Sequence, residues 1–183
     1  NIADIITYGD SLDDPEIMEL LKYQLRCNLA IAKEGLEKNY GAQVGKTLLM
    51  SVKAHNRDTV RTIAKAYAAA GSDARMSGCE MPVVINSGSG NQGISTTLPM
   101  AVFAKYMNIP AEKLLRAEFM AMLMIMYMKK HVGRLSPVCG AMVAGTGSAA
   151  GMTYMLGGSF EQISGAVQNM MGSVAGIFCD GAK

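Results

Sequence analysis

Apolar residues recur at spacings of three and four along most of this chain, a period typical of helices with one buried face. The clearest case follows Asp14-Pro15-Glu16, where Asp can cap free N–H groups and proline fits the first helical turn. Gly41 is expected to end this helix, whose apolar face comprises Met18, Leu21, Leu25, Leu29, Ala32 and Leu36. Residues 1–8 are short and mixed, and we interpret them as a strand or an edge segment.

The same period predicts five further helices, at about residues 56–70, 93–107, 110–131, 137–157 and 160–172. Gly71 is expected to end the first of them, and Pro99 to kink or divide the second. Ser159 and Gln162 form a capping-box pattern at the start of the last. The sequence therefore predicts a mainly α fold, a compact multi-helix domain spanning residues 1–183 as a single domain.

One predicted helix is unusual, because residues 135–160 contain no charged side chain. A membrane span is the alternative here, but the segment is rich in glycine and only mildly apolar. Small residues let helices approach closely, so we interpret it as a buried, glycine-rich central helix of a soluble protein. The ten apolar residues 119–128 are too few to span a bilayer and are assigned to the core.

A glycine-rich loop interrupts the helical pattern after the apolar run Pro82 to Ile85. Its residues are Asn86-Ser87-Gly88-Ser89-Gly90-Asn91-Gln92-Gly93, and a helical pattern follows. Glycines let backbone N–H groups converge, and a helix N-terminus attracts anions, so the loop can seat a phosphate or a carboxylate. An ordinary surface loop remains the alternative.

Residues 41–47 resemble a P-loop, but only three residues separate the two glycines, so we expect a turn between helices.

Charge and cysteine content narrow the classes of function. The net charge is only +2, no basic run exceeds Lys129-Lys130, and Trp is absent, so no nucleic-acid partner is expected.

Cys27, Cys79, Cys139 and Cys179 are widely spaced, which indicates a reducing compartment. Cys139 is placed at the third residue of its predicted helix, where free N–H groups suit a metal-ligating thiolate. Cys139 and Cys179 could share a metal, or each could be a small buried hydrophobe.

Several stretches resemble the L-cysteine desulfidase family, which is related to the alpha chain of iron–sulfur L-serine dehydratases. They are Gly78-Cys79-Glu80-Met81-Pro82-Val83, Asn86 to Ile94, Gly133 to Ser136 with Cys139-Gly140-Ala141, and Gly176 to Lys183. The resemblance covers most of the chain from Asp14 onward. It implies a cytoplasmic lyase carrying a [4Fe–4S] cluster that eliminates the β-substituent of a small L-amino acid. Cysteine would give pyruvate, ammonia and sulfide, and serine would give pyruvate and ammonia.

The resemblance also assigns roles to residues. Cys139 and Cys179 match cluster cysteines, and the family's third cysteine belongs to a Gly-Cys-Thr-Glu-Pro stretch that this sequence lacks. We therefore expect the C-terminal part of a longer enzyme, completed by the remainder of the same polypeptide or by a partner subunit. The loop residues expected to bind the substrate are Ser87, Gly88, Ser89, Gly90, Asn91 and Gln92. A homo-oligomer is possible, and no membrane partner is expected. The sequence does not identify the general base. The alternative function is a non-catalytic helical fragment that kept the fold without the cluster.

Overall fold

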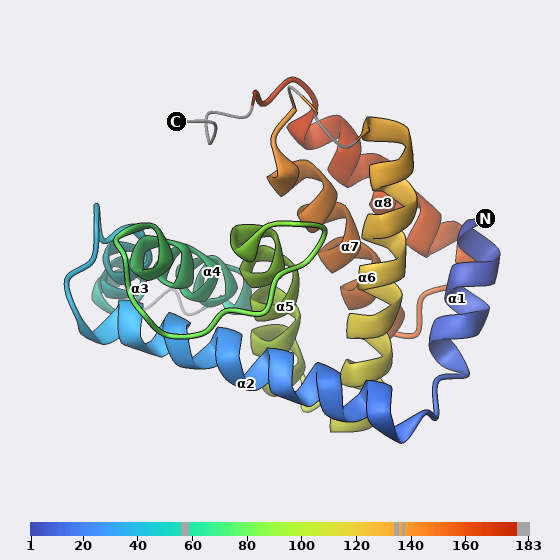
Figure 1. Cartoon of the computed structure of the whole chain (residues 1–183), viewed down its shortest axis with the longest axis horizontal. Helices are drawn as coiled ribbons and strands as arrows, with labels where there is room; N and C mark the ends of the chain where they lie inside the picture. Colours follow the sequence, from blue (N-terminus) through green and yellow to red (C-terminus); the bar gives the residue numbers. More distant parts are fainter. Residues whose placement is uncertain (56–58, 134–135, 137, 179–183) are drawn as a thin grey trace.

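The structure is a computed structural model that describes residues 1–55, 59–133, 136 and 138–178. Within these ranges the chain is mainly α-helical, which confirms the predicted fold class (Figure 1). Its only extended pairings there are two isolated bridges, Asn86 with Ser89 and Val138 with Phe178. The helices are α1 (Ile2–Asp10), α2 (Pro15–Glu37), α3 (Val44–His55), α4 (Val60–Met76), α5 (Gly90–Tyr106), α6 (Ala111–Val132), α7 (Gly140–Met155) and α8 (Phe160–Val174).

The N-terminal segment is a helix, so its assignment to a strand or edge was wrong. Asn1 accepts a hydrogen bond from the Asp4 backbone N–H, and Asp4 accepts one from the chain start, which makes a reciprocal cap. The two predicted caps are confirmed. Asp14 Oδ1 accepts from the Glu16 N–H at 2.9 Å, and Ser159 and Gln162 cap α8 reciprocally.

Other helices also differ from the sequence prediction. Helix α2 ends at Glu37, before Gly41. Helix α3 begins at Val44, inside the segment expected to be a turn. Helix α4 continues past Gly71 to Met76, because Gly71 serves close packing: an added Cβ would lie 3.2 Å from Ile94 Cγ2. Helix α5 runs unbroken through Pro99, so the tertiary contacts of the helix override the lost hydrogen bond.

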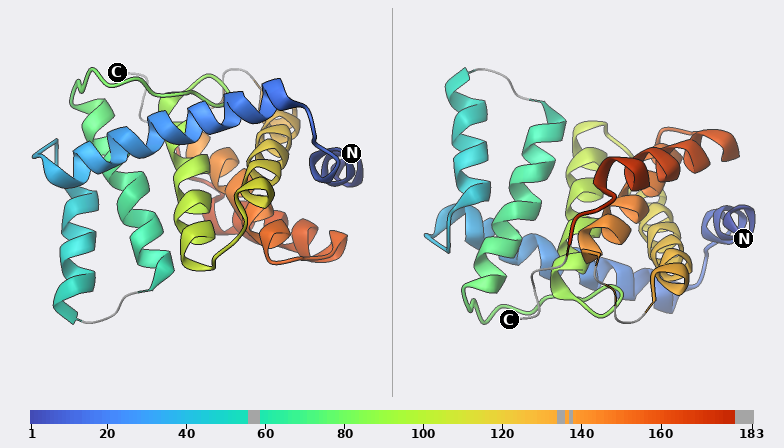
Figure 2. Two further views of the ribbon diagram at one scale, coloured as in Figure 1. Left: turned by 90° about the horizontal axis from the view of Figure 1, so that it is seen from below. Right: turned by 90° about the horizontal axis from the view of Figure 1, so that it is seen from above.

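The long helix α2 crosses the molecule and joins its parts. Seen from below, it lies across α4, α5 and α6 (Figure 2, left), and it contacts all three as well as α3. Leu21 of α2 packs with Leu115 of α6 near one end, and Ile31 packs with Ile94 and Leu98 of α5 further along. The helix α2 therefore fixes α5 relative to both α4 and α6.

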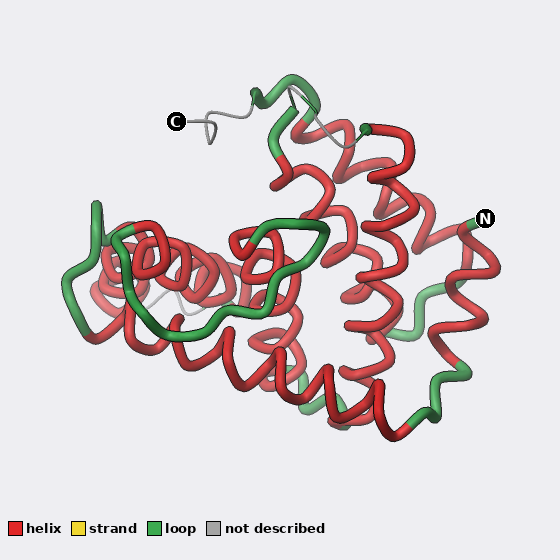
Figure 3. The backbone as a smooth tube through the Cα atoms, in the orientation of Figure 1, coloured by secondary structure: helices red, strands yellow, loops and turns green. Residues whose placement is uncertain are grey.

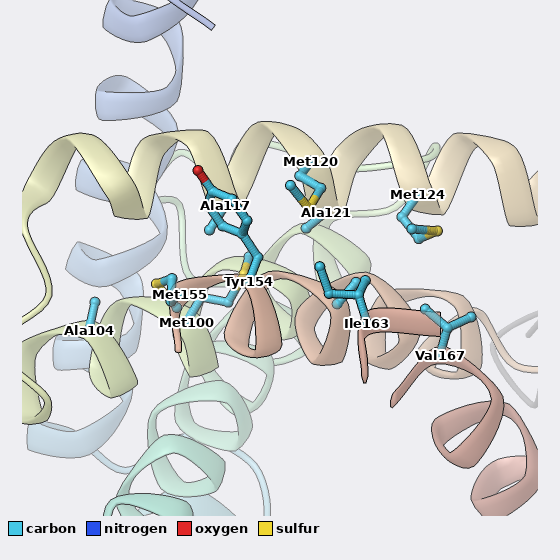
Figure 4. Close-up of a cluster of buried hydrophobic side chains, with 11 residues drawn as sticks. Met100, Ala104, Ala117, Met120, Ala121, Met124, Tyr154, Met155, Ile163 and Val167 are labelled. Carbon is cyan, nitrogen blue, oxygen red and sulfur yellow. The ribbon is translucent and has the colours of Figure 1, made fainter. Parts of the chain in front are cut away.

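Helix α7 is the buried glycine-rich central helix that the sequence predicts. It contacts α5, α6 and α8, and the largest cluster of buried side chains gathers around it from those three helices (Figure 4). An added Cβ at Gly147 would lie 2.8 Å from the Ala121 carbonyl oxygen of α6, and one at Gly151 would lie 2.3 Å from Met100 Sδ of α5. Among the described helices, none combines the length and apolar character needed to cross a membrane.

Glu118 of α6 is an exception to this apolar packing. Its side chain is fully buried, and neither carboxyl oxygen has a hydrogen-bond partner among the described residues. Burial disfavours the charged form and raises the pKa of this carboxyl from 4.5 to about 8. Glu118 is therefore held protonated at neutral pH.

We expect Gly147→Ala to lower the free energy of unfolding by ~1–2 kcal/mol, since overpacking outweighs the gain in helix propensity. The matched control is Gly165→Ala in α8, where an added Cβ meets nothing within 4 Å. This control should raise the free energy of unfolding by ~0.5–1 kcal/mol. Urea denaturation of both variants in the full-length protein measures the difference. Equal effects of the two substitutions would contradict close packing of α7.

Glu118→Gln should change how stability depends on pH. Between pH 4.5, where the unfolded carboxyl ionises, and about pH 8, only the folded state holds the proton. The free energy of unfolding of the unmodified protein should therefore fall through this window, by up to ~1.4 kcal/mol per pH unit. Glu118→Gln has no carboxyl to titrate at this position. Its free energy of unfolding, relative to that of the unmodified protein, should therefore increase as the pH rises. Parallel stability curves for the two proteins, measured by urea denaturation across this window, would contradict the burial argument.

Candidate functional site

The glycine-rich loop is held in place by a buried amide on α2. Asn28 is fully buried, its Oδ1 accepts from the Val84 N–H at 3.0 Å, and its Nδ2 donates to the Val84 carbonyl oxygen at 3.3 Å. The same Nδ2 donates to Thr97 Oγ1 of α5 at 3.1 Å. Asn28 therefore ties the apolar run before the loop to the helix after it. Figure 3 shows this long connection between α4 and α5 running along α2.

The loop closes with a tight turn immediately before α5. Asn86 and Ser89 exchange backbone hydrogen bonds of 3.2 and 3.1 Å. Between them, Ser87 (φ 52°) and Gly88 (φ 91°) are both left-handed, as in the two-residue hairpin turns that need positive φ at both central positions. The turn delivers the chain to Ser89, the N-cap of α5. Gly90, Asn91 and Gln92 are thus the first helical turn and not a loop, so the predicted start at Gly93 was three residues late.

The N-terminus of α5 presents hydrogen-bond donors. Ser89 makes no side-chain cap, and the first bond of the helix ladder runs from the Gly93 N–H to the Ser89 carbonyl oxygen at 3.1 Å. The N–H groups of Gly90, Asn91 and Gln92 therefore have no partner within the helix, and they form the positive end of the helix dipole. Free N–H groups of this kind favour an anionic group, and the binding of one by the loop stays a prediction.

Arg75, in the last turn of α4, reaches this helix start. Its Nη1 donates to Asn91 Oδ1 at 3.2 Å. Its guanidinium group lies against Gly90, where an added Cβ would be 2.3 Å from Arg75 Nε. Sequence reasoning missed Arg75, and the only available signal was a cation near the end of the helix that precedes the loop.

Cys139 is the N-cap of α7 and not the third residue of the helix. The thiol side chain is half-buried, makes no cap hydrogen bond and is not in a disulfide. The Cys139 N–H donates to the Ile177 carbonyl oxygen at 2.9 Å, and Val138 forms a bridge with Phe178. The residues just before Cys139 and just before Cys179 are thus paired. Cys179 itself lies outside the described residues.

Gln92 brings the start of α5 to the start of α7. An added Cβ at Gly140 would lie 2.3 Å from Gln92 Nε2 and 2.6 Å from its Cδ, so the amide rests on the glycine that follows Cys139. The Gln92 Oε1 is buried and has no hydrogen-bond partner among the described residues. Gln92 and Gly140, almost fifty residues apart in the sequence, therefore bring the starts of α5 and α7 together at the candidate site.

The other cysteines do not join this site. Cys27 is buried within α2, and Cys79 packs against the cluster of Ile31, Ala32, Ala74, Ile94 and Leu98. No group of three or more Cys, His, Asp or Glu side chains in the described ranges could hold a metal ion. Any metal centre here must take ligands from outside those ranges.

The sequence model of the serine dehydratase alpha chain matches residues 10–183, and the chain belongs to this family. A UPF0597 protein of Lachnoclostridium phytofermentans is 47% identical over 183 residues, which is 100% of this chain and 43% of that protein. A UPF0597 protein of Desulfitobacterium hafniense is 48% identical over 183 residues, 100% of this chain and 42% of that protein. The chain thus spans less than half of the length of these relatives. No solved structure matches it.

The contact between Gln92 and Gly140 can be tested by a double-mutant cycle. We expect Gly140→Val to lower the free energy of unfolding by ~1–3 kcal/mol, because the new side chain meets the Gln92 amide. In a Gln92→Ala background the same substitution should cost less than ~0.5 kcal/mol, because the obstacle is gone. Urea denaturation of the four full-length proteins gives the coupling energy. Additive effects would mean that the two residues are not in contact.

Proposed function

We propose that the full-length protein is an iron–sulfur-dependent lyase that eliminates the β-substituent of a small L-amino acid. The substrate would be L-cysteine, giving pyruvate, ammonia and sulfide, or L-serine, giving pyruvate and ammonia. Membership of the serine dehydratase alpha-chain family supports this class of reaction. One structural observation carries the proposal. The Gln92 amide from α5 and the segment ending at Phe178 both meet the chain at Cys139 and Gly140.

The proposed cofactor is a [4Fe–4S] cluster, and the donor at this point suits it. Clusters of this type are held by cysteine thiolates, and Cys139 offers a thiol outside any disulfide at a helix N-terminus. We assign Cys179 as the second ligand, because the pairing of Val138 with Phe178 brings the flanking chain together. The third ligand, like the rest of the enzyme, belongs to another part of the longer polypeptide or to a partner subunit. Iron–sulfur chemistry of this kind fits a cytoplasmic enzyme.

When bound, the cluster would supply a Lewis-acidic iron that helps the thiol or hydroxyl group of the substrate to leave. The residues of this chain would bind and orient the substrate. The N–H groups at the start of α5 are donors for the substrate carboxylate, following the turn of Ser87, Gly88 and Ser89. Gln92, resting on Gly140, would hold the substrate beside Cys139. Closely packed α5 and α7 keep these groups at a fixed separation, which favours reaction by orientation.

A non-catalytic fragment that kept the fold without the cluster is the second candidate. It agrees with the lack of a three-ligand metal group among the described residues. A chain of this kind would keep the helix packing and lose any need for Cys139. The two candidates therefore differ in what a change at this cysteine does.

Cys139→Ser should abolish the cluster in the full-length protein. After anaerobic preparation, we expect the unmodified protein to hold iron and acid-labile sulfide and to release pyruvate from L-cysteine or L-serine. The variant should lose both the bound iron and at least ~100-fold in activity, because a thiolate ligand is missing. Cys27→Ala, at a buried position within α2, is the matched control and should keep its iron. A folded full-length protein without iron, or a fully active Cys139→Ser variant, would contradict the cluster proposal.

A further inference from the structure

Arg75 is a half-buried cation that has no anionic partner among the described residues. The part of the chain that the structure describes gives its guanidinium group two contacts, Asn91 Oδ1 at 3.2 Å and Met76 Sδ at 3.5 Å, and no carboxylate. A guanidinium group has five N–H donors in a planar fork that matches a carboxylate. Asn91 uses one of these donors, so the fork keeps capacity for a second acceptor.

The position of Arg75 in α4 explains only part of this arrangement. A cation in the last turn of a helix is favoured by the helix dipole, and Arg75 lies in the last turn of α4. However, its guanidinium group extends to Gly90, at the start of α5, where the dipole is positive. Two positive features then meet, and no described carboxylate pairs with Arg75. An anionic ligand at this point relieves that unfavourable contact.

A buried amide at the foot of the same turn adds an independent indication. Asn86 is 4% exposed, and its Nδ2 has no hydrogen-bond partner among the described residues. A buried donor without a partner is costly unless something outside the polypeptide accepts its bond. Gln92, in the first turn of α5, carries a second buried atom without a partner among the described residues, and this one is an acceptor, Oε1. The start of α5 therefore offers an acceptor as well as the donors of Arg75 and Asn86.

We propose that Arg75 receives the α-carboxylate of the substrate and that Gln92 Oε1 accepts a hydrogen bond from its α-ammonium group. This inference rests on the proposed function and gives the substrate a direction. The carboxylate faces α4, the ammonium group faces Gln92, and the β-substituent is left nearest to Cys139. Asn91 positions the guanidinium group through the Nη1 bond. Amines without a carboxylate would lose the contact with Arg75.

Calorimetric binding to the full-length protein tests the carboxylate contact without turnover. The probes are 3-hydroxypropionate, which is serine without its ammonium group, and ethanolamine, which is serine without its carboxylate. Arg75→Met should weaken 3-hydroxypropionate binding ~10- to 100-fold, the value of a hydrogen bond to a charged group, and leave ethanolamine within about twofold. Arg75→Lys should fall between the two proteins, because it keeps the charge and loses the fork.

Asn91→Asp separates ligand binding from a purely structural role. The new carboxylate would occupy the guanidinium group from within the protein, so 3-hydroxypropionate should bind as weakly as it does to Arg75→Met. If Arg75 only held the start of α5 in place, the stronger ion pair would preserve binding and stability. The matched control is Arg61→Met, which removes the same charge from the exposed first turn of α4, ~20 Å along the helix. This control should bind both probes normally.

The possible outcomes separate this inference from the lyase proposal. An Arg75-dependent affinity for 3-hydroxypropionate in a protein without lyase activity would keep the inference and remove the proposed function. An active lyase in which Arg75→Met or Asn91→Asp leaves 3-hydroxypropionate binding unchanged would overturn the inference and keep the lyase. Failure of the unmodified protein to bind 3-hydroxypropionate, or equal weakening of both probes by Arg75→Met, would also overturn it.

Discussion

The close approach of α7 to its neighbours is the constraint on which the rest of the structure depends. At Gly147 and Gly151 there is no room for a side chain beside the backbone of α6 and the Met100 side chain of α5. Larger residues would push α7 outward. The first residues of α7 would then leave the start of α5, and Gln92 could no longer rest on Gly140. The geometry of the candidate site therefore depends on packing about two to three helical turns away from it. A helix with no charged residue, which reads at first like a membrane segment, is better explained by this demand for small and apolar side chains.

A second constraint acts on the loop that precedes α5. A connection of this length between helices would ordinarily be free to move, yet its apolar run is bound on both backbone groups of Val84 by the buried Asn28. The same amide also reaches Thr97. Because Asn28 is fully buried, any displacement of the loop would leave polar groups without partners in a low-dielectric interior. Asn28, a polar residue on the buried face of α2, thus positions the turn. The turn then determines where α5 begins.

The sequence predicts the helical class, the caps at Asp14 and Ser159 and the burial of the glycine-rich helix, because those features depend on local patterns. It fails where tertiary contacts decide. Gly71 has the local character of a helix end, but here it is the place where α4 packs against Ile94. Pro99 is a local breaker inside a helix that its neighbours hold together. The candidate site divides in the same way. Ser87 to Gln92 can be found from the glycine pattern. Arg75 gives only a weak signal, a cation near the end of the preceding helix, because its contacts depend on where the end of α4 meets the start of α5.

Buried polar atoms without partners would give a bound ligand a defined direction in the candidate site, which helix N-termini alone would not do. Two helix N-termini, those of α5 and α7, lack side-chain caps and face one region, so both attract anionic groups. In the proposed site the guanidinium group of Arg75 lies beside α5 and the Cys139 sulfur lies at the N-cap of α7, so the two termini would have different partners. Gln92, in the first turn of α5, has a buried acceptor, Oε1, that could serve the ammonium group of the proposed substrate. The amino acid that we propose as substrate carries both a carboxylate and an ammonium group, so it could use both the donors and the acceptor, whereas a phosphate could use only the donors.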